Sequence, residues 1–343
     1  MAPRWRVPLL VLGFLSLVLG VAGGLARLVP GLPAPGGAIA LHGALMVSGF
    51  FGTLIALERA AALDAPWAYA APLLSGAGGV LIAAGAAPAG FATLSAAAAA
   101  LVACTLVPAR RQPSLETFTL LAGSAAWLAG NAALALGRVS QGWWIAFFTL
   151  TIAAERLELS RYLRRRPSSR LLFAAIAVLV SVAPLDDSLA GLGVALILMA
   201  AWLAAFDLAR RTIRQTRLPR FAAACLLSGY VWLGLGGLLL ASGAGADAAL
   251  HAIFLGFVFS MVLGHAPVIL PAVLRVAFPY RPVLYLPLAL LHASVAARVA
   301  GGLLSSEALK TWGAWGNAGA MATFIVVAAL IVLRSRASRP ART

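Results

Sequence analysis

The stretch His251-Ala-Ile-Phe-Leu-Gly-Phe-Val-Phe-Ser-Met-Val-Leu-Gly-His265 decides the fold class, because the residues between its two histidines carry no charge. The whole chain of 343 residues has the same character. It is 62% hydrophobic and 10% charged, with a mean hydropathy of +0.97. This composition is typical of multi-pass membrane proteins and excludes an ordinary soluble globular domain. We therefore expect an all-α integral membrane protein that forms a single domain over residues 1–343.

Apolar stretches of about 20 residues, bounded by Pro, Gly or charge, predict a bundle of twelve transmembrane helices. The first one follows Met1-Ala-Pro-Arg-Trp-Arg6, and it is long enough to span and lacks a clear cleavage site, so we take it as a helix rather than a signal peptide. The twelve stretches begin near Val7, Gly37, Trp67, Gly90, Leu115, Trp143, Leu171, Leu189, Phe221, Ala248, Val283 and Leu309.

The basic residues predict how this bundle is oriented, because Lys and Arg tend to stay on the cytoplasmic side. With the N-terminus inside, all but four of the 26 Lys and Arg residues fall at cytoplasmic ends or loops, chiefly between Arg156 and Arg170 and between Arg210 and Arg220. The exceptions are Arg27, Arg138, Lys310 and Arg298. We expect both termini in the cytoplasm, in a bacterial plasma (inner) membrane. The net charge of +16 then reflects topology and attraction to anionic lipid, not nucleic-acid binding.

An internal similarity links residues 51–59 with residues 148–156. Aligned on Glu58 and Glu155, the two segments share five of nine residues, including Glu-Arg at the end. This repeat predicts three four-helix units in which the second, sixth and tenth spans are equivalent. The alternative is that two helices leave the membrane inward on similar charged residues. These residues form an ion-paired network, a proton entry route or a solvated interface pair.

Two histidines occupy equivalent depths in this topology. His42 opens the second span and His251 opens the tenth, and both spans run from outside to inside. An imidazole at such a place is costly without a partner, and two neutral imidazoles from facing helices are a common axial pair for b-type haem. We expect haem b bound through His42 and His251. The alternative is hydrogen bonding between helices.

Three further residues belong to this expected haem site. On an ideal helix, Met46 and Gly49 share one face with His42 and Thr53, and Gly49 would leave room for a flat macrocycle. Arg298, an intramembrane cation near the outer end of the eleventh span, could pair with haem propionates or extend to the membrane surface.

The inner half of the bundle holds His265 and His292. They are candidate ligands for a second haem or a copper ion, and the alternative is ordinary packing. On the side of the tenth span away from the histidines, Gly256, Ser260 and Gly264 recur every four residues. Such a ridge of small residues predicts close packing against a neighbouring helix.

Twelve helices, a histidine opening the second and His-Ala-x-x-x-Gly opening the tenth resemble subunit I of the haem-copper oxidases. In amino-acid sequence, the chain is similar to the NnrS family in three segments. They are residues 42–50 (His-Gly-Ala-Leu-Met-Val-Ser-Gly-Phe), residues 251–256 (His-Ala-Ile-Phe-Leu-Gly) and Arg298-Val-Ala-Gly301. These are membrane proteins containing haem and copper that are associated with bacterial nitric oxide metabolism.

The chain also departs from the oxidases. Their copper ligands lie on the sixth and seventh helices, whereas the sixth span here offers Trp143 and Trp144, and the seventh has no histidine. An oxygen-reducing centre is therefore not expected. The resemblance implies electron transfer, with a redox partner protein, or handling of a diatomic gas such as nitric oxide. Whether the protein is an enzyme stays open, and the rival class is a secondary transporter, which the many helices, glycine-rich segments and repeat also fit.

Overall fold

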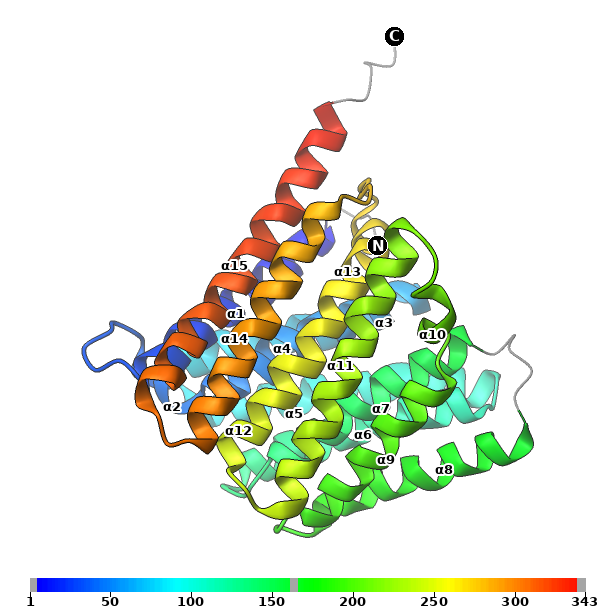
Figure 1. The fold of residues 1–343 in the computed structure, drawn as a ribbon, viewed down its shortest axis with the longest axis horizontal. Coiled ribbons are helices and arrows are strands. Elements are labelled where there is room, and N and C mark those ends of the chain that lie inside the picture. The colour runs from blue at the N-terminus through cyan, green and yellow to red at the C-terminus, as the bar shows by residue number, and fades with distance from the viewer. Residues whose placement is uncertain (1–4, 161–165, 338–343) are drawn as a thin grey trace. The chain divides into compact units, whose positions relative to one another are not determined.

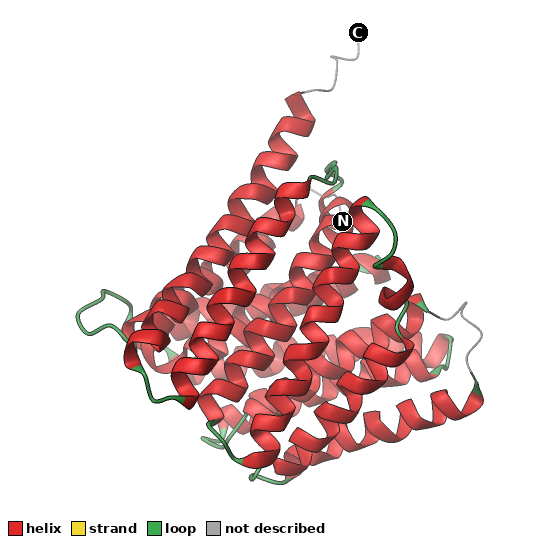
Figure 2. Cartoon of the chain, viewed as in Figure 1, coloured by secondary structure: helices red, strands yellow, loops and turns green. Residues whose placement is uncertain are grey.

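Helices account for 86% of this computed structural model, which describes residues 5–160 and 166–337, and no strand occurs among them (Figure 2). The expected all-α class is confirmed. The chain divides into two compact units, Met1–Glu158 and Leu159–Thr343. The division is thus into two parts, not into the three four-helix units that the internal similarity predicts.

The first unit is a series of long helices joined by short loops, and most helices pack against their neighbours in sequence (Figure 1). Its second long helix is continuous from Gly36 to Leu63 but contains a π-helical segment, η2. The elements are α1 (Arg6–Ala26), α2 (Gly36–Ala44), η2 (Leu45–Phe51), α3 (Gly52–Leu63), η3 (Pro66–Tyr69), α4 (Ala70–Ala83), α5 (Ala87–Arg111), α6 (Leu115–Ala135) and α7 (Gln141–Leu159).

The second unit has the same character, with one very short helix, α10, between two long ones. Its continuous helix from Ala246 to Leu274 also contains a π-helical segment, η5, directly after His251. The elements are α8 (Pro167–Val182), η4 (Ala183–Leu185), α9 (Ala190–Phe206), α10 (Ala209–Thr212), α11 (Arg217–Ser242), α12 (Ala246–His251), η5 (Ala252–Phe259), α13 (Ser260–Leu274), η6 (Pro282–Leu284), α14 (Tyr285–Leu303) and α15 (Glu307–Ala337).

Ten helices within the described residues are long and apolar enough to cross a membrane. Two further helices match predicted spans but are less clear. Helix α9 is apolar but has only 17 residues, and the last turns of α7 carry Glu155, Arg156 and Glu158. The structure therefore confirms a multi-pass membrane architecture, while the count of twelve spans and the orientation of the termini stay predictions.

A buried polar network holds the second long helix in the first unit. A π-helical turn leaves backbone groups out of the regular i→i−4 pattern, and the Ser48 carbonyl in η2 accepts a hydrogen bond from Ser75 of α4 (2.5 Å). The Ser48 hydroxyl donates to Asn131 of α6 (2.7 Å) and accepts from Trp127 (3.0 Å). Trp144 of α7 also donates to Asn131 (3.2 Å). Because every one of these groups has a partner, the network fixes four helices against each other.

In the second unit, the predicted ridge of small residues packs against α11. Gly256 lies under the Trp232 ring, Gly264 lies against Cys225, and Gly229 of α11 in turn receives Met261. A side chain at these glycines would overlap the neighbouring helix, so the prediction of close packing is confirmed. The ridge sets the position of the helix that carries His251 and His265.

Candidate functional site

His251 is the last residue of α12, and its imidazole is held by the backbone of its own helix. Its Nδ1 lies 2.7 Å from the carbonyl oxygen of Asp247, four residues earlier. A carbonyl only accepts hydrogen bonds, so Nδ1 carries the proton and the neutral ring keeps its lone pair on Nε2. Histidines that bind metals through Nε2 are commonly oriented by such a second hydrogen bond. The site therefore presents His251 in the protonation form that an iron ligand needs.

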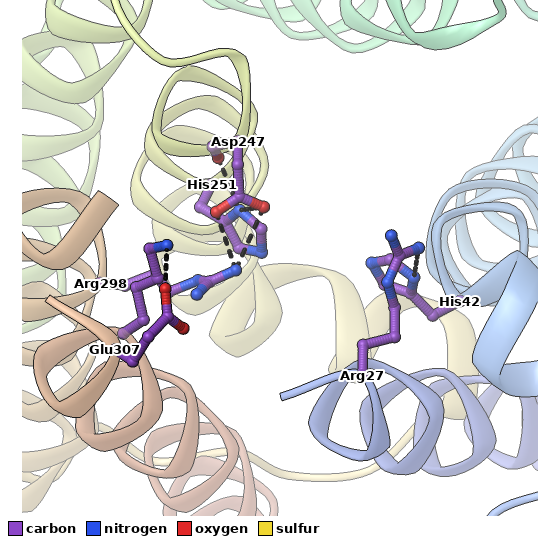
Figure 3. Close-up of polar contacts among 7 residues, drawn as sticks. Arg27, His42, Asp247, His251, Arg298 and Glu307 are labelled. Carbon is purple, nitrogen blue, oxygen red and sulfur yellow. Dashed lines mark hydrogen bonds and ion pairs between the residues drawn. The ribbon is translucent and has the colours of Figure 1, made fainter. Parts of the chain in front are cut away.

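Asp247 also binds Arg298 of α14 (Figure 3). Nη2 of Arg298 lies 2.8 Å from Oδ2 and 3.1 Å from Oδ1, and Oδ1 is 3.4 Å from Nδ1 of His251. The Arg298 side chain is 7% exposed and that of Asp247 is 56% exposed. The sequence analysis expects Arg298 to pair with a haem propionate. In the structure, the carboxylate that Arg298 binds is that of Asp247. Nη1 of Arg298 is buried and has no hydrogen-bond partner in the described part of the chain, so one donor remains for a ligand.

The same end of the second unit carries a second ion pair. Lys310 Nζ lies 2.6 Å from Oε1 of Glu307 in the first turn of α15. Helix α15 approaches α14 closely here, because Gly313 lies directly against the backbone of Arg298. This close approach buries Arg298 and limits the directions in which its guanidinium can move.

His42 follows a kink in α2, where Leu41 has non-helical backbone angles. Its Nδ1 lies 3.4 Å from Nη1 of Arg27 (Figure 3). Arginine only donates, so Nδ1 accepts, and a neutral ring carries its proton on Nε2. Binding of iron through Nε2 therefore requires the proton to move and Arg27 to withdraw. At 3.4 Å the contact is long for a hydrogen bond.

The residues predicted to share a face with His42 do lie on one side, and that side contacts α1. His42, Met46 and Thr53 each lie beside a glycine of α1, namely Gly24, Gly20 and Gly13 respectively. These glycines let the two helices approach closely. Met46 is therefore a packing residue of the interface between α1 and η2.

The expected room for a macrocycle at Gly49 is wrong. A Cβ atom at this position would lie 2.7 Å from the Ser16 hydroxyl and 3.4 Å from the Cα of Gly79. The space beside Gly49 is filled by α1 and α4. The glycine serves the contact of three helices, and a haem bound near His42 would have to lie on another side of the helix.

The two remaining histidines differ in the nitrogen that carries the lone pair of the neutral ring. His265 donates from Nδ1 to the carbonyl of Met261 (2.7 Å), as His251 does to Asp247. Nδ1 of His292 instead accepts from Nε1 of Trp232 (2.8 Å), and the planes of the two rings are nearly parallel (12°). Neutral His292 therefore carries its proton on Nε2 and has no lone pair for a metal there. This arrangement favours His265 over His292 as an inner ligand.

No cluster of three or more His, Cys, Asp or Glu side chains suited to a metal ion occurs among residues 5–160 and 166–337. His42 belongs to the first unit and His251 to the second. Their binding to one iron therefore stays a prediction.

The two segments of the internal similarity contact each other in the first unit, at the end of the helix Gly36–Leu63 that lies away from His42. Arg59 Nη2 lies 2.7 Å from Glu58 and 3.0 Å from Glu155, with side chains 18 to 26% exposed. Phe51 and Phe148, also equivalent in the alignment, meet edge to face at 5.0 Å. The two helices thus run side by side in the same direction, and the acidic and basic residues form an ion-paired network.

Sequence reasoning missed the partners of the histidines. Asp247 could have been found, because it lies one helical turn before His251 and residues four apart share a face. Arg27 directly follows α1 and Trp232 lies on α11, and no periodicity connects them with His42 or His292. The π-helical segments also have no clear sequence signal.

The chain matches the family described as Domain of unknown function (DUF8744) over residues 6–333. It belongs to this family. Comparison with curated proteins and with solved structures gives no match.

Proposed function

We propose that the protein binds haem b in a bacterial plasma membrane, with His251 and His42 as axial ligands, and that it transfers electrons or handles a diatomic gas such as nitric oxide. Bound haem would supply a one-electron redox centre. Two axial histidines favour electron transfer to a redox partner protein, because gas binding requires one ligand to leave. The resemblance to the NnrS family supports the choice of haem.

One observation carries the proposal: the Asp247 carbonyl accepts a hydrogen bond from Nδ1 of His251, which places the lone pair of the neutral ring on Nε2. Asp247 and Arg298 support this arrangement, since the carboxylate approaches the same ring and binds the buried guanidinium. The remaining Nη1 donor of Arg298 suits a propionate of the proposed haem. A second metal, haem or copper, would be expected at His265.

The absorption spectrum of the purified full-length protein tests the proposal. We expect a Soret band and a reducible α-band, and loss of most haem in His251→Ala and in His42→Ala. His292→Ala is the matched control, because that ring is engaged by Trp232, and it should keep wild-type haem content. Wild-type haem content in both His251→Ala and His42→Ala, or a purified protein without a Soret band, would refute the assignment.

A secondary transporter is the second candidate, favoured by the division of the chain into two units that each contain a long helix with an irregular, π-helical segment. Transporters of several folds have two halves with discontinuous helices at the substrate site. The expected sign is haem-free protein that moves a solute into liposomes. Haem in the purified protein, together with no uptake above empty liposomes, would exclude this candidate.

The topology is part of the proposal. With twelve spans and both termini cytoplasmic, Arg27 and Arg138 lie outside, and Arg110 and Arg211 lie inside. Single cysteines introduced at these positions in a variant lacking Cys104 and Cys225 should separate into two groups in labelling with an impermeant reagent on whole cells. Labelling of Arg211→Cys from outside would contradict the orientation.

A further inference from the structure

A cavity of about 860 Å³ opens in the second unit, where the first turn of α8 faces the end of α9 and the short helix α10. These elements are drawn in green in Figure 1. The lining is rich in arginine. Arg166 comes from the start of α8, Arg210 and Arg211 from α10, and Arg214 from the turn that follows.

Of the arginines that line this cavity, Arg210 binds another group of the protein. Arg210 donates from Nη1 to the carbonyl of Ala205 (2.6 Å), so it caps the end of α9. Asp207 also lines the cavity, but its carboxylate is buried and accepts from the backbone N–H of Ala209. Arg211 and Arg214 are exposed to the cavity. The cavity therefore favours an anion.

The first turn of α8 adds donors of a different kind. Its N-cap is Arg166, whose side chain cannot accept a hydrogen bond, and no side chain caps the helix. The uncapped end carries a partial positive charge. Ser169 in this turn is 6% exposed, and its hydroxyl has no hydrogen-bond partner in the described part of the chain. Its carbonyl accepts from Trp202 of α9 (2.9 Å), which fixes its place in the wall of the cavity.

One side of the cavity is apolar. Leu172, one turn further along α8, is 50% exposed, and Phe206 at the end of α9 is 39% exposed. Exposed apolar side chains beside an arginine cluster at a helix end suit an amphiphile whose acidic group binds the arginines and whose chain follows the helices.

From these four features we infer that the cavity binds a phosphate group, with a phospholipid headgroup as the form that uses both its basic and its apolar sides. Arg211 and Arg214 would pair with the phosphate oxygens. The Ser169 hydroxyl is buried in the wall, so it would donate to one of these oxygens after its side chain turns toward the cavity. The apolar side would contact the acyl chain. Basic pockets at the cytoplasmic ends of membrane helices bind acidic lipid headgroups in this way.

Native mass spectrometry of the full-length protein in detergent, with added phosphatidylglycerol, phosphatidylcholine or inorganic phosphate, tests the inference. We expect retention of phosphatidylglycerol and a loss of affinity of about tenfold or more in Arg211→Gln/Arg214→Gln. The matched control is Arg110→Gln/Arg111→Gln, which removes the same charge from the exposed end of α5. It should stay within about twofold of wild type.

Ser169→Ala is a second, smaller perturbation that preserves the charge. Removing a buried hydroxyl without a partner should leave the unliganded protein as stable as before or more stable, while phosphatidylglycerol binding falls several-fold. Competition by inorganic phosphate with no preference for lipid would support the phosphate site and identify a soluble ligand. Equal loss in both double variants, or unchanged binding in Arg211→Gln/Arg214→Gln and Ser169→Ala, would overturn the inference.

Discussion

Replacing Asn131 by Leu tests how much the buried network stabilises the first unit. The two side chains have the same number of heavy atoms, so the change removes polarity with little change in shape. Asn131 accepts from Ser48 (2.7 Å) and Trp144 (3.2 Å), and donates to the carbonyl of Leu94 (3.1 Å). All three bonds join α6 to other helices.

The size of the effect follows from these three bonds. Side-chain hydrogen bonds between membrane helices contribute about 0.6 kcal/mol on average and about 1.7 kcal/mol at most. Three of them give a loss of about 2 kcal/mol in the free energy of unfolding, with about 5 kcal/mol as the upper limit. The groups left without partners in Asn131→Leu are buried, which places the expected loss above the average rather than below it.

Equilibrium unfolding in mixed micelles, followed by tryptophan fluorescence, measures this loss. Asn317→Leu is the matched control, because Asn317 is also buried (4% exposed) but its side chain makes one such bond within the described residues, accepted from Ser294 (2.7 Å). It should lose about a third as much as Asn131→Leu. A loss in Asn131→Leu no greater than that in Asn317→Leu would refute the reasoning that the network stabilises through the number of its bonds.

Two other substitutions test the packing and the charge network by the same unfolding assay. Gly23→Ala should lose about 1–3 kcal/mol, because its Cβ would overlap the carbonyl of Ala38, whereas Gly36→Ala, which faces open space, should change stability by less than about 0.5 kcal/mol. Arg59→Gln should lose about 1–3 kcal/mol, since two carboxylates then lack their cation, and adding Glu155→Gln should recover part of the loss; no recovery would show that the ion pairs do not determine the effect.

The surroundings of His42 show which features of the site can be predicted from the spacing of residues. Periodicity correctly placed His42, Met46 and Thr53 on one face, because a helix repeats every 3.6 residues whatever it packs against. It could not say that α1 covers this face. The sequence therefore suggested that Gly49 leaves space for a cofactor. In the structure, that space is filled by α1 and α4.

Which ring nitrogen of each histidine carries the proton is a second property that the sequence pattern could not predict. His251 and His292 are the same residue type in apolar helices, yet one donates from Nδ1 to a carbonyl and the other accepts there from Trp232. The first partner is local, one turn away on the same helix. The second comes from another helix and depends on how α11 and α14 pack.

The amino-acid sequence alone determined the all-helical class, the membrane character and the approximate start of each helix, because all three depend on local composition and on the length of apolar runs. The tertiary structure decided which groups meet: Arg298 with Asp247, Arg59 with Glu155, and four arginines with the buried Ser169 hydroxyl around one cavity. Hydrophobicity is nearly additive along a chain, whereas an ion pair or a hydrogen bond needs a geometry that only the packed helices provide.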